Sequence, residues 1–145
     1  MLNEFATQIF EANKAKGFWD ERLLLANKME QSDLFSEKEV AYVRASIISQ
    51  LLVLQVSELA EAQEAHRKGK FANIRAYQTA LTENKAIDNR QAFELYIKDT
   101  FEDEIADTII RLLDMCGGLA INIDWHIAQK LRYNAGRKKL HGKNY

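Results

Sequence analysis

The chain of 145 residues contains no proline and only six glycines. A series of β-turns depends on such residues, because proline fixes a turn backbone and glycine adopts conformations that other residues avoid. Apolar side chains recur instead at the spacing of helical turns. We therefore expect an all-α fold without strands.

The length suits one domain that buries most of its apolar surface, so we expect a single domain over residues 1–145. Hydrophobic residues make up 47% of the chain and charged residues 28%. This balance is typical of a folded soluble protein and argues against a disordered chain.

The formal net charge of −1 gives no general attraction to nucleic acid or to an anionic membrane. The lone Cys116 cannot form an internal disulfide, and the N-terminus has no secretory pattern. No apolar run approaches the roughly 20 residues that span a bilayer. We therefore expect a cytoplasmic protein without nucleic-acid or membrane partners.

Caps and glycines predict where the first helices begin and end. Ser36 and Glu39 have the spacing of a capping box, which opens the longest helix, and Gly69 is placed to stop it. Two shorter helices precede it and are separated near Gly17. The first carries Leu2, Phe5, Ile9 and Phe10, and the second carries Leu23, Leu24, Ala26 and Met29.

Residues 71–92 show weak periodicity and predict a connector with one short helix. The next helix is expected from about Phe93 or Asp99 to the pair Gly117 and Gly118, which would stop it.

Asp124 is expected to cap a last helix that runs through about Lys139. Counting this helix, the chain has four main helices with an apolar face each. Four such helices predict a helical bundle or half of one.

Two carboxylates lie on the apolar stripe of the longest predicted helix. At about 100° per residue, Glu58 shares a stripe with apolar side chains of neighbouring turns, and Glu61 lies at its edge. These apolar residues are Ile47, Leu51, Leu54, Ala62 and Ala65. The pair is therefore expected on the buried face.

The stretch 101–110, FEDEIADTII, repeats this pattern. On a helical wheel Glu104 and Asp107 occupy a narrow polar groove with apolar residues on both sides. Glu102 and Asp103 point elsewhere, and we expect them to be solvated or interface charges.

Burying several like carboxylates without a cation costs many kcal/mol or forces them to take up protons. The compensation is either a network of ion pairs with Lys or Arg, or a divalent metal ion. Ion pairs are the commoner explanation of one acid pair, but two pairs on apolar faces favour a metal. If the two helices pack antiparallel, the four acids converge, and an all-oxygen cluster suits Mg²⁺ or Mn²⁺.

The C-terminal stretch carries much of the positive charge. On a helix Lys130, Asn134, Arg137 and Lys138 share a face, so that three cations and an amide could hold one polyanion. A solvated helix end that complements the helix dipole is the simpler interpretation of this stretch alone. Together with four metal-seeking acids, a triphosphate held between a metal and Lys or Arg is the better explanation.

These motifs, in this order, resemble the MazG-like nucleotide pyrophosphohydrolases of the all-α NTP pyrophosphatase superfamily. The resemblance covers roughly residues 15–145, and the interval between Glu61 and Glu104 is longer than in the compact family pattern. The motifs are Glu58-Leu59-Ala60-Glu61, Glu104-Ile105-Ala106-Asp107, Lys130-x-x-x-Asn134-x-x-Arg137, His141-Gly142-Lys143 and Lys16-Gly17-Phe18-Trp19.

The resemblance implies a MazG-like bundle completed by assembly into a homodimer or homotetramer. It also implies Mg²⁺-dependent hydrolysis of an NTP or dNTP between the α and β phosphates, giving the monophosphate and pyrophosphate. The implied catalytic residues and metal ligands are Glu58, Glu61, Glu104 and Asp107, and the implied contacts to phosphate or sugar are Lys130, Asn134, Arg137 and Lys143.

Two alternatives stay open from the residues themselves. Trp19 is a candidate for stacking on a nucleotide base, but a loop aromatic that anchors the first helix fits equally well. The whole chain could also be a non-catalytic helical oligomerisation or interaction module whose acids pair with Lys and Arg.

Overall fold

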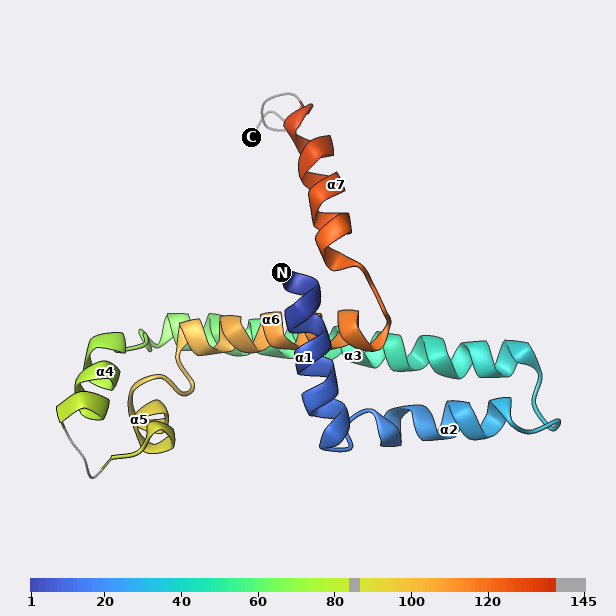
Figure 1. The fold of residues 1–145 in the computed structure, drawn as a ribbon, viewed down its shortest axis with the longest axis horizontal. Coiled ribbons are helices and arrows are strands. Elements are labelled where there is room, and N and C mark those ends of the chain that lie inside the picture. The colour runs from blue at the N-terminus through green and yellow to red at the C-terminus, as the bar shows by residue number, and fades with distance from the viewer. Residues whose placement is uncertain (84–86, 138–145) are drawn as a thin grey trace. The chain divides into compact units, whose positions relative to one another are not determined.

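The structure is a computed structural model that describes residues 1–83 and 87–137. Seven helices and no strand occur in these two ranges, so the all-helical prediction is confirmed (Figure 1). The helices are α1 (Leu2–Ala15), α2 (Asp20–Glu30), α3 (Glu37–Arg67), α4 (Ile74–Glu83), α5 (Asn89–Tyr96), α6 (Phe101–Gly118) and α7 (Ile123–Ala135). The sequence predicted six helices, four of them main helices, and the additional helix lies in the connector.

The chain separates into two compact units. One consists of residues 1–20 and 113–145, and the other consists of residues 21–112. α6 contributes to both units, because its first two-thirds belong to the second unit and its last turns to the first.

α3 has the termini that the sequence predicts. The Ser36 hydroxyl accepts a hydrogen bond from the Glu39 backbone N–H, and the Glu39 carboxylate accepts one from the Ser36 N–H at 2.8 Å. At the other end Gly69 has a φ of +65°, and the Lys70 N–H donates to the Ala65 carbonyl at 2.9 Å. This is a glycine-terminated Schellman motif, so the capping box and the stop at Gly69 are confirmed.

The connector contains more helix than the sequence predicted. α4 and the start of α5 both fall within residues 71–92, and the two helices pack together. A second capping box opens α5, since the Asp88 carboxylate accepts from the Gln91 N–H at 2.8 Å and the Gln91 side chain accepts from the Asp88 N–H at 3.1 Å. The prediction of one short helix is therefore wrong, although the Asp-x-x-Gln spacing was visible in the sequence.

α5 and α6 are separate helices because the backbone turns between them. Asp99 has a φ of +58°, in the left-handed region that a helix interior does not admit. Its N–H donates to the Asp103 carboxylate at 3.0 Å. Of the two predicted starts for the helix that contains FEDEIADTII, the one near Asp99 is close to the observed start at Phe101.

α6 ends at Gly118, as predicted, but the paired glycines are not its left-handed stop. That conformation belongs to Ala120, with a φ of +53°. The Ile121 N–H donates to the Cys116 carbonyl at 2.8 Å, and the Ala120 N–H donates to the Gly117 carbonyl at 3.2 Å. α6 thus ends in a Schellman motif whose left-handed residue is an alanine.

The two glycines allow close packing within the first unit. A Cβ on Gly117 would lie 2.4 Å from the Ala6 carbonyl oxygen, and a Cβ on Gly118 would lie 2.2 Å from the Trp19 ring. The Trp19 ring also packs edge-on against Phe10, with centroids 5.3 Å apart. The small core of this unit contains Ala6, Leu113 and Cys116, with Leu2, Ile9, Ile121 and Ile123 around it.

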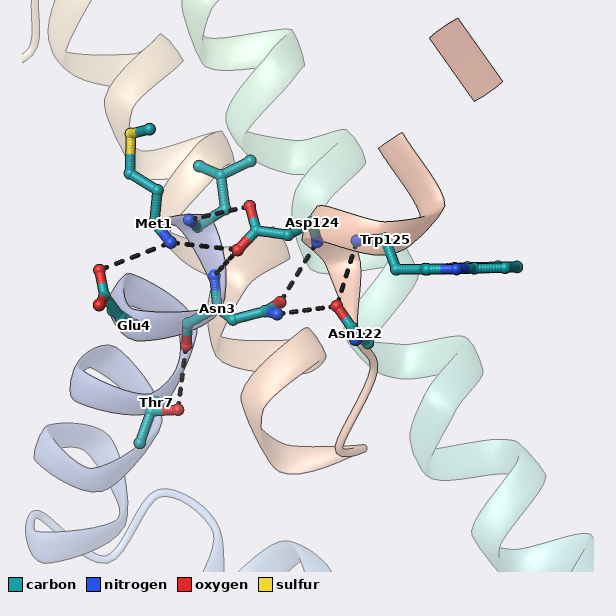
Figure 2. Close-up of polar contacts among 8 residues, drawn as sticks. Met1, Asn3, Glu4, Thr7, Asn122, Asp124 and Trp125 are labelled. Atoms are coloured by element: carbon teal, nitrogen blue, oxygen red, sulfur yellow. Dashed lines mark hydrogen bonds and ion pairs between the residues drawn. The ribbon is translucent and has the colours of Figure 1, made fainter. Parts of the chain in front are cut away.

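The beginnings of α1 and α7 exchange capping groups (Figure 2). The Asn122 side chain caps α7 by accepting from the Trp125 N–H at 3.1 Å. Asp124 accepts instead from the backbone N–H groups of Leu2 and Asn3 at the start of α1, each at 3.1 Å. The prediction that Asp124 caps the last helix is therefore wrong.

α7 ends at Ala135, before the predicted end near Lys139, a residue that lies outside the described ranges. Within the described residues, α3 is the one helix that is long and apolar enough to cross a membrane by length and composition alone. Only 17% of its most apolar window is buried.

Gly118→Ala is expected to destabilise the protein, because the new methyl group collides with the Trp19 ring. Overpacking of this kind costs about 1–3 kcal/mol, which outweighs the gain of about 1 kcal/mol in helix propensity. Gly136→Ala is the matched control, because its nearest contact would be an ordinary 3.7 Å. Chemical denaturation of both variants measures the change, and equal stability of the two variants would contradict the packing role of Gly118.

Asp124→Asn is expected to lower the melting temperature at neutral pH. Hydrogen bonds, first that from the Asn3 backbone, hold the pKa of the Asp124 carboxylate below its usual 3.8. Stability from such a group is present above the unfolded pKa and is lost as the pH falls through the folded pKa. The difference in melting temperature between wild type and variant should therefore shrink below about pH 4. Circular dichroism melts across the acid range test this, and a gap that does not change with pH would contradict it.

Candidate metal centre

The second unit brings the two predicted acid pairs together. α3 and α6 lie side by side and run in opposite directions (Figure 1). Near one end the Phe101 N–H donates to the Lys70 carbonyl at 2.9 Å, and further along Arg111 pairs with Glu58. The antiparallel packing that the convergence of the acids required is therefore present in this unit.

Three of the four predicted acids form one cluster. Carboxylate oxygens of Glu58, Glu61 and Glu104 all lie within 4.8 Å of one another. Glu58 and Glu104 are each only 6% exposed, whereas Glu61 is exposed. The expected burial is thus correct for Glu58 and Glu104, and Glu61 at the edge of the stripe keeps contact with solvent.

Asp107 lies in the same cleft but outside the three-residue cluster, and its side chain is exposed. The cleft has a volume of about 610 Å³. Its lining includes seven carboxylates and three cations, which gives a formal charge of −4. The lining residues are Glu58, Glu61, Asn89, Arg90, Phe93, Glu94, Lys98, Asp99, Asp103, Glu104, Asp107 and Arg111.

The environment of the cleft disfavours the ionised form of two of its carboxyl groups, those of Glu104 and Asp107. Burial raises the pKa of Glu104, and neighbouring carboxylates, Glu61 foremost, raise it further. Burial and the charge of Asp103 also raise the pKa of Asp107, while Arg111 acts in the opposite direction. Without added cations, the site therefore holds its acids in unfavourable proximity.

Among residues 1–83 and 87–137, a direct cation is present for only one member of the cluster. Arg111 Nη2 lies 2.5 Å from Glu58 Oε1, and the guanidinium is 43% exposed. Among the described residues, no group forms an ion pair or a hydrogen bond with the carboxylate of Glu104. A nearly buried carboxylate without a partner, directed toward two others, is the arrangement that a hard cation with oxygen ligands would complete.

The two acids expected to point elsewhere differ from each other. The Glu102 carboxylate accepts a hydrogen bond from the Ala72 N–H at 2.9 Å and does not line the cleft. Asp103 is partly buried and does line it, so its expected role as a bystander is wrong. Its side chain is directed there because it accepts from the Asp99 N–H at the turn before α6.

Sequence reasoning missed several residues of the cleft. Arg111 follows Asp107 by four residues and Glu104 by seven, so the helical spacing that selected the acids could have selected it too. Asn89, Arg90, Phe93 and Lys98 carried no such signal, because their approach to the acids depends on how the connector folds.

The predicted phosphate ligands belong to the other compact unit. Lys130 Nζ lies 5.2 Å from the centre of the Tyr133 ring, and the guanidinium carbon of Arg137 lies 5.9 Å from it. The Asn134 side-chain oxygen is buried and has no hydrogen-bond partner within residues 1–83 and 87–137. Lys130 and Asn134 thus lie in the last turns of α7 and Arg137 lies just after it, while Lys138 and Lys143 lie outside the described residues.

Trp19 is 2% exposed in the first unit, and its indole N–H donates to the Asp114 carboxylate at 3.0 Å. This is the environment of an aromatic residue that anchors neighbouring helices. A contact of Trp19 with a nucleotide base stays a prediction and would require this packing to open.

Glu104→Gln is expected to raise the melting temperature of the metal-free protein by a few degrees, because it removes a repelled charge. The folded protein raises the pKa of Glu104 above its usual 4.5. Ionised Glu104 therefore destabilises the folded protein once the pH rises above 4.5. The stability gained by Glu104→Gln should accordingly grow toward neutral pH. Glu64→Gln is the control of opposite sign, since the Glu64 carboxylate pairs with Lys68 at 3.0 Å.

Melts in chelator, followed by titration with Mg²⁺, measure both effects. Mg²⁺ should raise the melting temperature of the wild type more than that of Glu104→Gln, because a ligand of the native state stabilises it. If Glu104→Gln melts at a lower temperature than the wild type in chelator, the Glu104 carboxylate has a stabilising partner within the protein and the prediction is wrong.

Comparison of the chain with protein-family models, with curated proteins and with solved structures found no match.

Proposed function

We propose that the protein is a Mg²⁺-dependent nucleoside triphosphate pyrophosphohydrolase of the MazG-like type, with Mn²⁺ as a possible substitute. The observation that carries the proposal is the Glu104 carboxylate, which is 6% exposed, has no cation bound to it among the described residues, and lies within 4.8 Å of Glu58 and Glu61. Their all-oxygen donor set fits a hard divalent cation.

The charge of the cleft supports a phosphate substrate only in the presence of metal. A lining with a formal charge of −4 repels a triphosphate, and three cations cannot offset both the lining and the substrate. When bound, a divalent cation would acidify a water molecule and neutralise charge on phosphoryl oxygens.

In this proposal Glu58, Glu61 and Glu104 hold the cation, and Arg111 keeps Glu58 in place through its ion pair. Asp107 is the proposed acceptor of the proton from the attacking water, because it is exposed in the same cleft and its raised pKa makes it a stronger base than an ordinary Asp. The water oxygen bonds to phosphorus, the bridge between the α and β phosphates breaks, and the monophosphate and pyrophosphate leave.

The remaining predicted contacts, those of Lys130, Asn134, Arg137 and Lys143 with phosphate or sugar, are part of the proposal. Their support is the positive charge of this stretch and the buried Asn134 oxygen, which has no hydrogen-bond donor among the described residues.

The second candidate function is a non-catalytic helical interaction module. It is favoured by the ion pair between Arg111 and Glu58, which is how such a module would compensate a buried acid. The variant Arg111→Ala distinguishes the two candidate functions. It removes the cation that compensates Glu58 and should destabilise the protein under either function, but Mg²⁺ should restore the stability only if the acid cluster binds the metal.

We further propose a cytoplasmic homodimer or homotetramer. Its support is an apolar strip on α3, formed by Leu52, Val53, Val56 and Leu59, whose side chains are 48–63% exposed. Exposed apolar surface of this kind is commonly covered by a partner. Light scattering coupled to gel filtration measures the assembly, and a monomer at all concentrations would contradict it.

Incubation with a panel of nucleotides and Mg²⁺ should release pyrophosphate and the monophosphate. Glu104→Gln should lower the rate by about 10²–10³-fold, the effect of removing one preorganised charged group from an active site. Glu64→Gln, on the same helix as Glu58 and Glu61 but outside the acid cleft, should retain full activity. Chelator should abolish turnover. Release of orthophosphate alone, or full activity of Glu104→Gln, would contradict the proposal.

A further inference from the structure

One face of α5 forms a wall of the acid cleft. Asn89, Arg90, Phe93 and Glu94 all line it, and each of the last two lies four residues after one of the first two, as neighbours on one helical face do. Ala92, on the opposite side, is fully buried. The connector therefore places a second chemical surface next to the carboxylates, with an aromatic ring and cations.

Phe93 is the aromatic residue among those that line the cleft, and it is 39% exposed. An apolar ring beside seven carboxylates contributes little to the core of the unit at this exposure. A flat π-face at the edge of a charged cleft is the feature on which a nucleotide base stacks.

Two cations accompany the ring. Arg90 Nε lies 3.0 Å from Glu94, and Lys98 Nζ lies 2.9 Å from Asp99. The side chains of Arg90 and Lys98 are 86% and 53% exposed, and exposed ion pairs contribute little to stability. Each cation can therefore exchange its carboxylate for a phosphate oxygen with little loss.

We propose that α5 and the turn after it recognise the nucleotide: Phe93 stacks on the base, and Arg90 and Lys98 contact its phosphates. This inference rests on the proposed function and defines its substrate class as phosphates that carry a base, so that inorganic tripolyphosphate binds poorly. The cleft volume of about 610 Å³ lies within the range for small-ligand sites.

The test measures binding without turnover. Isothermal titration calorimetry with a nucleoside triphosphate analogue, whose bridge between the α and β phosphates is a methylene group, reports affinity in the presence of Mg²⁺. Phe93→Ala should weaken binding about tenfold, the size of one lost stacking contact. Leu95→Ala is the matched control, because Leu95 is 65% exposed on the same helix and does not line the cleft.

The charge is tested in the same way. Arg90→Gln should weaken binding of the analogue several-fold, whereas Arg75→Gln on α4 should not change it, since Arg75 lines a different pocket. Phe93→Leu keeps an apolar side chain but removes the ring, and should also weaken binding. Circular dichroism melts identify any variant that fails to fold. If Phe93→Ala fails to fold, Phe93→Leu is used in its place.

Mn²⁺ binding, followed by electron paramagnetic resonance, separates the two proposals. We expect Phe93→Ala and Arg90→Gln to bind Mn²⁺ as the wild type does, and Glu104→Gln to lose it. Wild-type affinity of the folded Phe93 variants for the analogue, or equal binding of tripolyphosphate, would overturn the role of α5 and leave the metal centre intact. If the wild type binds neither Mn²⁺ nor the analogue, both proposals are overturned.

Discussion

The antiparallel pairing of α3 and α6 is the constraint on which the candidate site depends. It places Glu58, Glu61 and Glu104 within 4.8 Å of one another, although the part of the chain that the structure describes supplies a direct cation only to Glu58, from Arg111. The packing of α3 against α6 buries apolar side chains, which stabilises the unit, but it also brings like-charged carboxylates together, which destabilises it. An excess of negative charge over positive charge is expected in a site that binds a cation, because a bound cation relieves the repulsion between the carboxylates and is held more tightly as a result.

The same constraint explains the importance of the segment between the two acid motifs. The turn at Asp99 sets the start of α6, and its N–H directs the Asp103 carboxylate toward the cleft. The capping box at Asp88 fixes the start of α5, whose Arg90 and Phe93 then line the same cleft as the acids. The long interval between the motifs thus forms part of the cleft and is more than a spacer.

The first unit is organised by local backbone requirements. Gly117 and Gly118 admit the backbone of α1 and the ring of Trp19 at distances that a side chain would block. The beginnings of α1 and α7 then satisfy each other, with the Asp124 carboxylate on the N–H groups of α1. Because the first N–H groups of a helix have no partner within it, this exchange stabilises both helix ends.

The sequence by itself determined the helical class, both ends of α3 and the burial of Glu58 and Glu104, because these follow from local caps and from the 3.6-residue period. Only the tertiary structure decided that Asp124 caps a distant helix, that Asp107 lies outside the three-acid cluster, and that Phe93 lines the cleft. These outcomes depend on which helices meet and at what register. A helical wheel describes one helix and its faces, but not the partner on the other side.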